Sequence, residues 1–415
     1  MSGRWLPLRV CNGTSLRAPA LAAFLAVTAC SGSGPTDHGP SLQARLQTAL
    51  DRALSDYGGK GVSAAVVLHG DLAWRGTAHA EGSAPVASDD LFLIASITKM
   101  FTAVVTLQLI DEGVLHFDDQ LHQFLPTYQY LDSTITVRQL LDHTAGVFDF
   151  SGNHPSYNAM MDEDRYKCWT PEETVTRLLL EPHNPPGAAW RYSTGNYVVL
   201  GMVIQAVTGR PVSEEFRTRI YEPLGLQHTF LDCADTIAGA FANVWIDLTG
   251  DGVPEENPVA PLGRQSMSST GFTGGGMISS AGDIARFTDA LFGRRVLLSP
   301  AMLEEMLDFN TDLPADFGWL GYGKGAGIFR LSMVNGAHAY GHGGWMAVVL
   351  SATAYLPDYD ASITIMSNSL NWPFWEGVMN ALATVVTEGV GPAAPSPPAP
   401  SLRAQRAGRN PARSP

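Results

Sequence analysis

Two pairs of short apolar segments lie near opposite ends of the chain, and a turn interrupts each pair. Residues 61–79, "GVSAAVVLHGDLAWRGTAH", predict two strands around Gly70 and Asp71, and residues 346–369, "MAVVLSATAYLPDYDASITIMSNS", predict two more. Residues 373–388 have the apolar spacing of a closing helix, and the sequence between the pairs is mostly helical in pattern. We therefore expect an α+β fold: an antiparallel sheet formed by N- and C-terminal strands, flanked by helices, with a mostly helical insertion.

The first residues have the composition of an export signal. Arg4, Arg9 and Arg17 precede the apolar run "APALAAFLAVTA" (18–29), which is too short to span a bilayer but suits the core of a signal peptide over residues 1–29. The next residue is Cys30, and "VTAC" resembles a bacterial lipobox, which predicts lipid attachment to that cysteine. Ordinary cleavage without a lipid is the alternative. In both cases we expect an exported protein of the cell envelope or periplasm, and with the lipid a membrane contact through the anchor.

The regions at the two ends of the chain differ in composition from the middle. Residues 30–44 contain "SGSGPTDHGP" and are expected to be a tether, whereas residues 389–415, rich in Pro, Ala and Arg, are expected to be disordered. The chain has 26 basic and 40 acidic side chains, and residues 1–29 and 391–415 contain arginines but no acid. The middle is therefore strongly acidic, which disfavours nucleic acid and anionic membrane surfaces as partners.

Cysteine usage gives one expectation about covalent structure. If Cys30 carries a lipid, Cys168 and Cys233 remain as an even pair in an oxidising compartment, so a disulfide between them is possible. Two buried free thiols are the competing interpretation.

A lysine stands in the long apolar stretch "LIASITKMFTAVVTLQLIDEG" (93–113), where a lone ammonium is costly. Apolar residues recur at helical spacing and Gly113 is a likely stop, so a helix is expected with Ser96 in its first turn. Lys99, three residues on, lies on the same face and can activate the Ser96 hydroxyl. A capping role for Ser96, with Lys99 reaching to solvent, is the alternative.

Two later stretches add candidate groups. In "WRYSTGNYVVLG" (190–201), Tyr192 precedes a Ser-Thr-Gly turn and can present its hydroxyl to a cleft. In "AYGHGGWMAV" (339–348), His342 stands between glycines at the entry to a strand, where an edge strand offers N–H groups to an oxyanion.

In this order, "SITK" (96–99), "YST" (192–194) and "HGG" (342–344) resemble the three active-site motifs of a family of serine hydrolases. That family includes class C β-lactamases, D-Ala-D-Ala carboxypeptidases, D-aminopeptidases and β-lactamase-like esterases, and its motifs are Ser-X-X-Lys, Tyr-X-Asn, and Lys-Thr-Gly or His-X-Gly. The resemblance covers roughly residues 45–388, which we take as the hydrolase domain, and implies the β-lactamase/transpeptidase-like fold. Four further stretches support it: "LLDHTAGV" (140–147), "YEPLGLQHT" (221–229), "GGGMISSAGDIARF" (274–287) and "YLPDYDASITIMSN" (355–368).

The resemblance implies acyl-enzyme catalysis without a cofactor or metal. Ser96 attacks a carbonyl, and Lys99 and Tyr192 share the proton transfers, with either one as the base. A tyrosinate needs nearby cations, for which Lys99 and then His342 are the candidates. The expected oxyanion donors are the N–H of Ser96 and an N–H after the glycines, with Met346 as the expected residue.

Two residues depart from the family's motifs. Thr194 stands where the family usually has asparagine, whose amide contacts the amide of the substrate. His342 replaces the lysine of typical β-lactamases and points to the carboxypeptidase and esterase branches. With His342, Gly343 and Gly344, Thr194 is expected to bind substrate, which is a D-amino acid peptide, an ester or a β-lactam.

Other classes fit the sequence less well. His338 and His342 are four residues apart, but in a strand pattern and without His-Glu-X-X-His, which disfavours a metal hydrolase. "DLTGDGVPEE" (247–256) has the start of a calcium loop, but Pro258 stands where the loop needs its last glutamate. An α/β-hydrolase is disfavoured because Gly-X-Ser-X-Gly is absent from the sequence. A catalytically weak penicillin-recognising or scaffolding envelope protein and a true β-lactamase remain as alternatives.

Overall fold

The computed structural model describes residues 40–151, 154–259, 262–309, 323–333 and 336–391, which belong to one compact unit. The helices are α1 (Leu42–Tyr57), α2 (Thr98–Asp111), α3 (Val137–Leu141), α4 (Pro155–Glu163), α5 (Pro171–Leu178), α6 (Thr194–Thr208), α7 (Val212–Phe216), α8 (Glu222–Leu224), α9 (Arg264–Gly275), α10 (Ala281–Thr288), α11 (Pro300–Met306) and α12 (Trp372–Gly389). The strands are β1 (Gly61–Leu68), β2 (Asp71–His79), β3 (Phe92–Leu93), β4 (Thr229–Leu231), β5 (Val244–Ile246), β6 (Glu255–Asn257), β7 (Met277–Ser279), β8 (Gly323–Gly325), β9 (Ile328–Ser332), β10 (His338–Met346), β11 (Val349–Leu356) and β12 (Ala361–Ser367).

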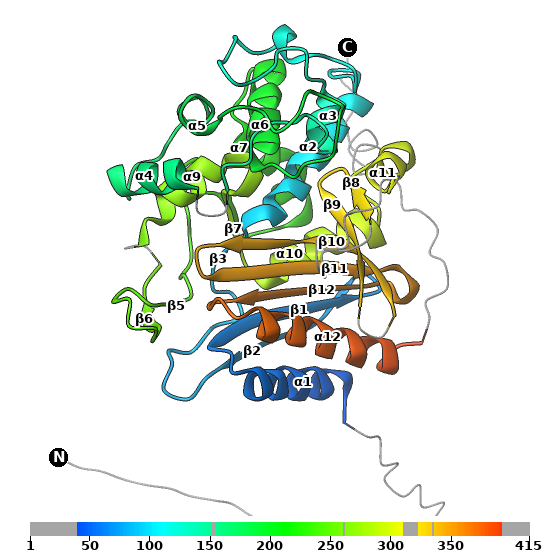
Figure 1. Cartoon of the computed structure of the whole chain (residues 1–415). Helices are drawn as coiled ribbons and strands as arrows, with labels where there is room; N and C mark the ends of the chain where they lie inside the picture. The colour runs from blue at the N-terminus through cyan, green and yellow to red at the C-terminus, as the bar shows by residue number, and fades with distance from the viewer. Residues whose placement is uncertain (1–39, 152–153, 260–261, 310–322, 334–335, 392–415) are drawn as a thin grey trace, which may run out of the picture. The chain divides into compact units, whose positions relative to one another are not determined.

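One seven-stranded antiparallel sheet joins the two ends of the domain, in the order β2-β1-β12-β11-β10-β9-β8 (Figure 1). The N-terminal strand β1 pairs along its length with the C-terminal strand β12, from Val62 opposite Ser367 to Leu68 opposite Ala361. The two strand pairs, the closing helix and the α+β class predicted from the sequence are confirmed. Two smaller sheets, β3-β7-β4 and β5-β6, lie within the insertion.

Helices cover both faces of the large sheet, so its central strands are apolar on both sides. Ala64, Val66 and Leu68 of β1 belong to the cluster with α1 and α12, whereas Ala65 and Val67 belong to the cluster with the other helices. Every residue of β1, β11 and β12 is buried. This explains why these strands carry small and apolar residues, with only Ser, Thr and Tyr as polar ones and no charged side chain.

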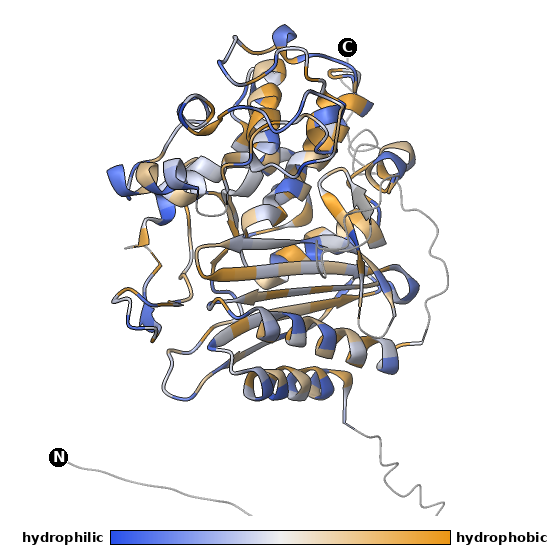
Figure 2. Cartoon of the chain, in the orientation of Figure 1, coloured by the Kyte–Doolittle hydropathy of each residue, from blue (hydrophilic) through white to orange (hydrophobic). Residues whose placement is uncertain are grey.

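Helix α1 is amphipathic, and its hydrophilic residues alternate with apolar ones along the ribbon (Figure 2). Leu46, Leu50 and Ala53 form its buried face. The helix begins at Leu42, inside residues 30–44 for which a tether is expected, because the Ser41 hydroxyl accepts a hydrogen bond from the Ala44 N–H and caps it. Cys30, the expected signal peptide and the tail beyond residue 391 lie outside the described residues. Within the described chain, the helices are too short or too polar to cross a membrane.

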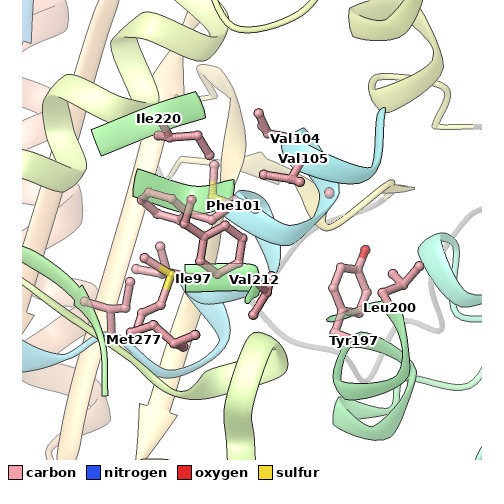
Figure 3. Close-up of a cluster of buried hydrophobic side chains, with 14 of the residues drawn as sticks. Ile97, Phe101, Val104, Val105, Tyr197, Leu200, Val212, Ile220 and Met277 are labelled. Atoms are coloured by element: carbon pink, nitrogen blue, oxygen red, sulfur yellow. The ribbon is translucent and has the colours of Figure 1, made fainter. Parts of the chain in front are cut away.

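Helix α2 lies inside the helical part of the molecule rather than on its surface. Phe101 stacks on Phe287 with ring centroids 3.7 Å apart, and Figure 3 shows Ile97 and Phe101 beside Val212 and Ile220. The helix begins at Thr98, so Ser96 lies in a preceding 3₁₀ turn (Ala95–Ile97) instead of in the first α-helical turn. Nearly all residues of this helix are buried, so the packing around it positions the residues at its start.

Candidate active site

Ser96 is held by a strained and clamped segment. Ala95 has φ 47°, a left-handed conformation that is rare for a residue with a Cβ and persists only where the surroundings impose it. Ile94 supplies that constraint, because its N–H donates to the Met277 carbonyl at 3.0 Å and its carbonyl accepts from the Ser351 hydroxyl at 3.0 Å. The segment therefore fixes the direction of the Ser96 side chain, which lines a cavity of about 360 Å³.

Lys99 is fully buried behind Ser96. Its Nζ lies 3.0 Å from the Ser96 Oγ, 2.7 Å from the Gly274 carbonyl oxygen and 3.4 Å from the Thr194 Oγ1. Burial lowers the pKa of Lys99 to about 7, although the negative charge of Asp149 acts in the other direction and raises it. A neutral amine can donate to Gly274 and Thr194 while its lone pair accepts the Ser96 proton, so the amine is arranged as a base.

Tyr192 is the second side chain that contacts the Ser96 hydroxyl. Its hydroxyl donates to the Ser96 Oγ at 2.8 Å, and burial raises the pKa of Tyr192 above its ordinary value, so the side chain is a phenol. The pKa of His342 is lowered to about 3 by burial and by the charge of Lys99. His342 is therefore neutral, and the expectation that it serves as a second cation beside a tyrosinate is wrong.

His143 holds Tyr192 in place, a role that sequence analysis missed. The two rings lie 4.6 Å apart at 31°, and the His143 Nδ1 accepts from the Ser193 N–H at 3.2 Å and faces the Asn196 amide at 3.0 Å. His143 itself has φ 60°. The only sequence signal was its place in the stretch 140–147, which carried no assigned role.

Asp149 is a second missed residue. Its carboxylate accepts from the Thr194 N–H at 3.0 Å, and so caps α6 in place of Ser193, whose hydroxyl donates to the Phe148 carbonyl instead. The same carboxylate acts on the charge of Lys99. Asp149 thus links the start of α6 to the charge balance of the site.

The "HGG" motif lies within β10, and beyond Gly341 the edge of this strand is not paired with β9. A Cβ on Gly344 would lie 2.2 Å from the Ile94 carbonyl oxygen, so the glycine allows this strand to touch the segment that carries Ser96. The Nδ1 of His342 lies 2.5 Å from the Gly343 carbonyl oxygen. These residues join the strand to the nucleophile, and His342, Gly343 and Gly344 all line the cavity.

The register of β10 bears on the oxyanion donor. Met346 pairs with Val349 across the two-residue turn at residues 347–348, and such a flanking pair exchanges both backbone hydrogen bonds. The Met346 N–H therefore points toward β11, and the alternation turns the Trp345 N–H toward the opposite edge. The expected donor Met346 does not fit this register, whereas Trp345 does.

The family model described as Beta-lactamase matches residues 46–386, which is most of the chain. The chain belongs to the beta-lactamase family. The membership of the serine hydrolase family predicted from the sequence motifs is thereby confirmed, and the family fold agrees with the observed antiparallel sheet and helices.

Individual relatives carry several different names. The D-stereospecific amidohydrolase from Streptomyces sp. is 31% identical, with a TM-score of 0.69 over 85% of this chain and 100% of that chain. The D-amino acid amidase from Ochrobactrum anthropi SV3 is 26% identical, with a TM-score of 0.72 over 84% of this chain and 99% of that one. Esterase EstB from Burkholderia gladioli is 30% identical over 45% of this chain, and the match spans only about half of EstB, 51%.

The remaining site predictions concern a metal and a disulfide. Asp247, Asp251 and Glu255 lie within 4.8 Å of one another, but Asp247 already accepts the N–H groups of Gly250 and Gly252, and the Asp247 side chain is at the surface. Among the residues described, His338 and His342 belong to no such group. Cys168 and Cys233 are bonded as a disulfide.

Proposed function

We propose that this protein is a serine hydrolase that forms an acyl-enzyme on Ser96 and acts as an esterase or as a peptidase like the D-Ala-D-Ala carboxypeptidases. The observation that carries the proposal is the convergence of the Lys99 amine and the Tyr192 hydroxyl on one oxygen, the Ser96 Oγ, at 3.0 and 2.8 Å. The names of the relatives, which include an esterase, amidases and a putative carboxypeptidase, agree with this class.

Acylation begins when the Ser96 Oγ bonds to the substrate carbonyl carbon and its proton passes to the neutral Lys99 amine. The carbonyl electrons move to the oxygen, where the N–H groups of Ser96 and Trp345 are the proposed donors. The bond to the leaving group then breaks, and the leaving group takes a proton through the Tyr192 hydroxyl, which is replenished from Lys99. A water repeats the sequence on the acyl-enzyme, releases the acid and returns the proton to Ser96.

The lowered pKa of Lys99 and the raised pKa of Tyr192 favour the amine as the base. Judged by residue type alone, either Lys99 or Tyr192 could take the proton of the Ser96 hydroxyl. Burial of the Lys99 amine destabilises its charged form, and burial of the phenol destabilises the phenolate, so both effects act in the same direction. Tyr192 then acts as a neutral proton carrier.

The test is a covalent label together with a chromogenic ester. Wild-type protein treated with a fluorophosphonate should gain one adduct on Ser96 by mass spectrometry and should hydrolyse p-nitrophenyl acetate. Ser96→Ala should lose both, whereas Ser55→Ala on the exposed face of α1 should keep both. Hydrolysis by Ser96→Ala at the wild-type rate would refute the proposal.

Two other outcomes of these assays would favour the alternative functions. An adduct on Ser96 without turnover of esters, amides or β-lactams would favour the penicillin-recognising or scaffolding protein. Cephalosporin hydrolysis as efficient as ester hydrolysis would favour a true β-lactamase.

We also propose that the protein is exported and anchored through a lipid on Cys30. Supporting this are the sequence "VTAC" after a short apolar run and the presence of a disulfide, which is typical of oxidising compartments. Cys30→Ser should move the protein from the membrane fraction to the soluble fraction. Wild-type protein found only in the soluble fraction would contradict the anchor.

A further inference from the structure

The cavity at Ser96 combines an exposed aromatic wall with a lining whose described residues include no Asp, Glu, Lys or Arg. We propose that it selects substrates with an uncharged, bulky apolar group, preferably aromatic, which Trp345, Trp372 and Leu370 hold, and that it rejects substrates with a carboxylate in this position. The inference rests on the proposed acyl-enzyme function and narrows it to substrates whose acyl group is uncharged and apolar.

The described lining of the cavity contains no Asp, Glu, Lys or Arg. The internal segments that the structure does not describe, 152–153, 260–261, 310–322 and 334–335, contain no Lys or Arg in the sequence either. A substrate carboxylate that enters the cavity loses water and gains no cationic partner from these residues. Such an unpaired charge is strongly disfavoured.

The two basic side chains of the site, Lys99 and His342, cannot supply that cation. Lys99 is fully buried, and its contacts go to Ser96, Gly274 and Thr194. His342 is 2% exposed, and its Nδ1 lies at hydrogen-bond distance from the Gly343 carbonyl, while burial and the charge of Lys99 lower its pKa to about 3. Both groups therefore serve the nucleophile and its strand rather than an anion.

The aromatic wall consists of three tryptophans packed edge to face. The Trp345 and Trp372 rings lie 5.9 Å apart at 74°, and the Trp372 and Trp375 rings lie 5.3 Å apart at 88°. Trp375 is 2% exposed and anchors the set, whereas Trp372 is 38% exposed, Trp345 44% and Leu370 46%. These are large apolar surfaces left open at the catalytic cavity, which all four residues line.

Local bonding holds the wall in place before a ligand arrives. Asn371 caps α12 by accepting from the Phe374 N–H at 3.0 Å, and its amide donates to the Tyr57 carbonyl at 2.9 Å. The Trp345 indole donates to the Ala347 carbonyl at 2.7 Å. A fixed aromatic face loses little conformational entropy on binding, so it favours a flat, apolar partner.

Continuity with Ser96 identifies the occupant as part of the substrate. Trp345 belongs to the strand that borders the nucleophile, and its backbone N–H is the proposed oxyanion donor. A substrate group held by the Trp345 indole must therefore be joined to the reacting carbonyl by a small number of bonds. This placement distinguishes the wall from the scattered apolar residues elsewhere on the surface, such as Leu248.

The experiment compares p-nitrophenyl esters that share one leaving group. Butyrate and hemisuccinate have the same chain length and differ by a carboxylate, whereas acetate and phenylacetate differ by an aromatic ring. Each kcat/KM is first divided by the rate constant for the reaction of the same ester with hydroxide, which removes differences in intrinsic reactivity. The corrected wild-type value should be about 100-fold higher for butyrate than for hemisuccinate. It should be about tenfold higher for phenylacetate than for acetate. Equal values within either pair would overturn the proposal.

Variants locate the effect. Trp372→Ala should lower the phenylacetate-to-acetate ratio about tenfold, and Leu370→Arg should raise the hemisuccinate-to-butyrate ratio by at least about tenfold. Leu248→Ala, an exposed apolar residue outside the cavity lining, should leave both ratios unchanged and is the matched control. Unchanged ratios in Trp372→Ala and Leu370→Arg, with the acetate ester still hydrolysed through Ser96, would refute the wall and leave the proposed function standing. Loss of Ser96-dependent hydrolysis of every ester in the wild type would refute the proposed function itself.

Discussion

At the scale of single residues, Lys99 depends most on its surroundings. An exposed lysine is charged at neutral pH, but here the amine is surrounded by a carbonyl, two hydroxyls and the Tyr192 ring, whose centroid lies 4.8 Å away. The position in the sequence suggests contact with Ser96, because residues three apart share a helix face. The low pKa depends on burial by α6 and α9, which the sequence spacing does not reveal.

The lowered pKa of Lys99 sets the pH dependence. Below about 7 the amine is protonated and cannot accept the Ser96 proton, so kcat/KM should rise as the pH increases through about 7. Asp149 favours the charged form, so Asp149→Asn should move this acidic limb to lower pH by about one unit while its amide oxygen still accepts from the Thr194 N–H. The measurement is kcat/KM against pH with p-nitrophenyl acetate.

Asp358→Asn, at the exposed turn between β11 and β12, removes a carboxylate outside the cavity lining and is the matched control. Its profile should coincide with that of the wild type. A limb that stays at the same pH in Asp149→Asn, or that shifts equally in the control, would contradict the role given to Asp149.

Thr194 carries a prediction on substrate preference. Its hydroxyl lies 3.4 Å from the Lys99 Nζ and it lines the cavity, but it offers one short polar group where asparagine offers both a donor and an acceptor. Thr194→Asn should raise kcat/KM for amide-bearing substrates over simple esters by about three- to tenfold. Equal changes for D-amino acid amides and p-nitrophenyl acetate would show that Thr194 does not set this preference.

At the scale of elements, α9 delivers the carbonyl that accepts from Lys99. Phe272 breaks this helix with φ 39° and ψ −126°, so the chain leaves the helical path just before Gly274. A Cβ on Gly274 would lie 2.7 Å from the Thr194 carbonyl oxygen and 3.0 Å from the Thr194 Cγ2. This glycine is therefore required by the close approach of α9 and α6.

Two neighbouring glycines make a matched test of this approach. Gly274→Ala should displace the Gly274 carbonyl from Lys99 and lower kcat for p-nitrophenyl acetate by about 10²-fold or more. Gly275→Ala should cost far less, since its Cβ would meet only ordinary contacts at 3.6 and 3.9 Å. Similar losses in the two variants, with both folded by circular dichroism, would contradict this account.

The sequence predicts these elements unevenly, for physical reasons. The strands β1, β2, β11 and β12 were visible because they are short, apolar and separated by turns. The exact start of α2 was not, since the left-handed Ala95 is imposed by contacts from β7 and β11. The proposed donor Trp345 was missed because it depends on a hairpin register, and His143 because its contacts with Tyr192 and α6 are formed only in the folded protein.

At the scale of the whole molecule, the Cys168–Cys233 disulfide joins residues 65 positions apart. Next to it, the Trp169 N–H donates to the Ser269 hydroxyl at 2.9 Å and its indole to Ser266 at 2.7 Å, so the bridge lies beside α9. Closing a loop of this length lowers the entropy of the unfolded chain. The bridge is expected to stabilise the protein by about 4 kcal/mol in the chain-entropy model.

The double variant Cys168→Ser with Cys233→Ser should lower the free energy of unfolding, measured by urea denaturation, by about 2–4 kcal/mol. A reductant should destabilise the wild type similarly and leave the double variant unchanged. If the wild type were equally stable with and without reductant, the bridge would not contribute.

The pairing of β1 with β12 has a consequence for the order in which the chain folds. During synthesis β1 emerges early, and β12 emerges only when almost the whole domain has been made. Until then a mostly apolar strand has one partner, β2, and an open edge that invites association with other chains. A protein with this topology must stay protected or unfolded until its last strand arrives, and a chain interrupted before Ala361 has no route to the native sheet.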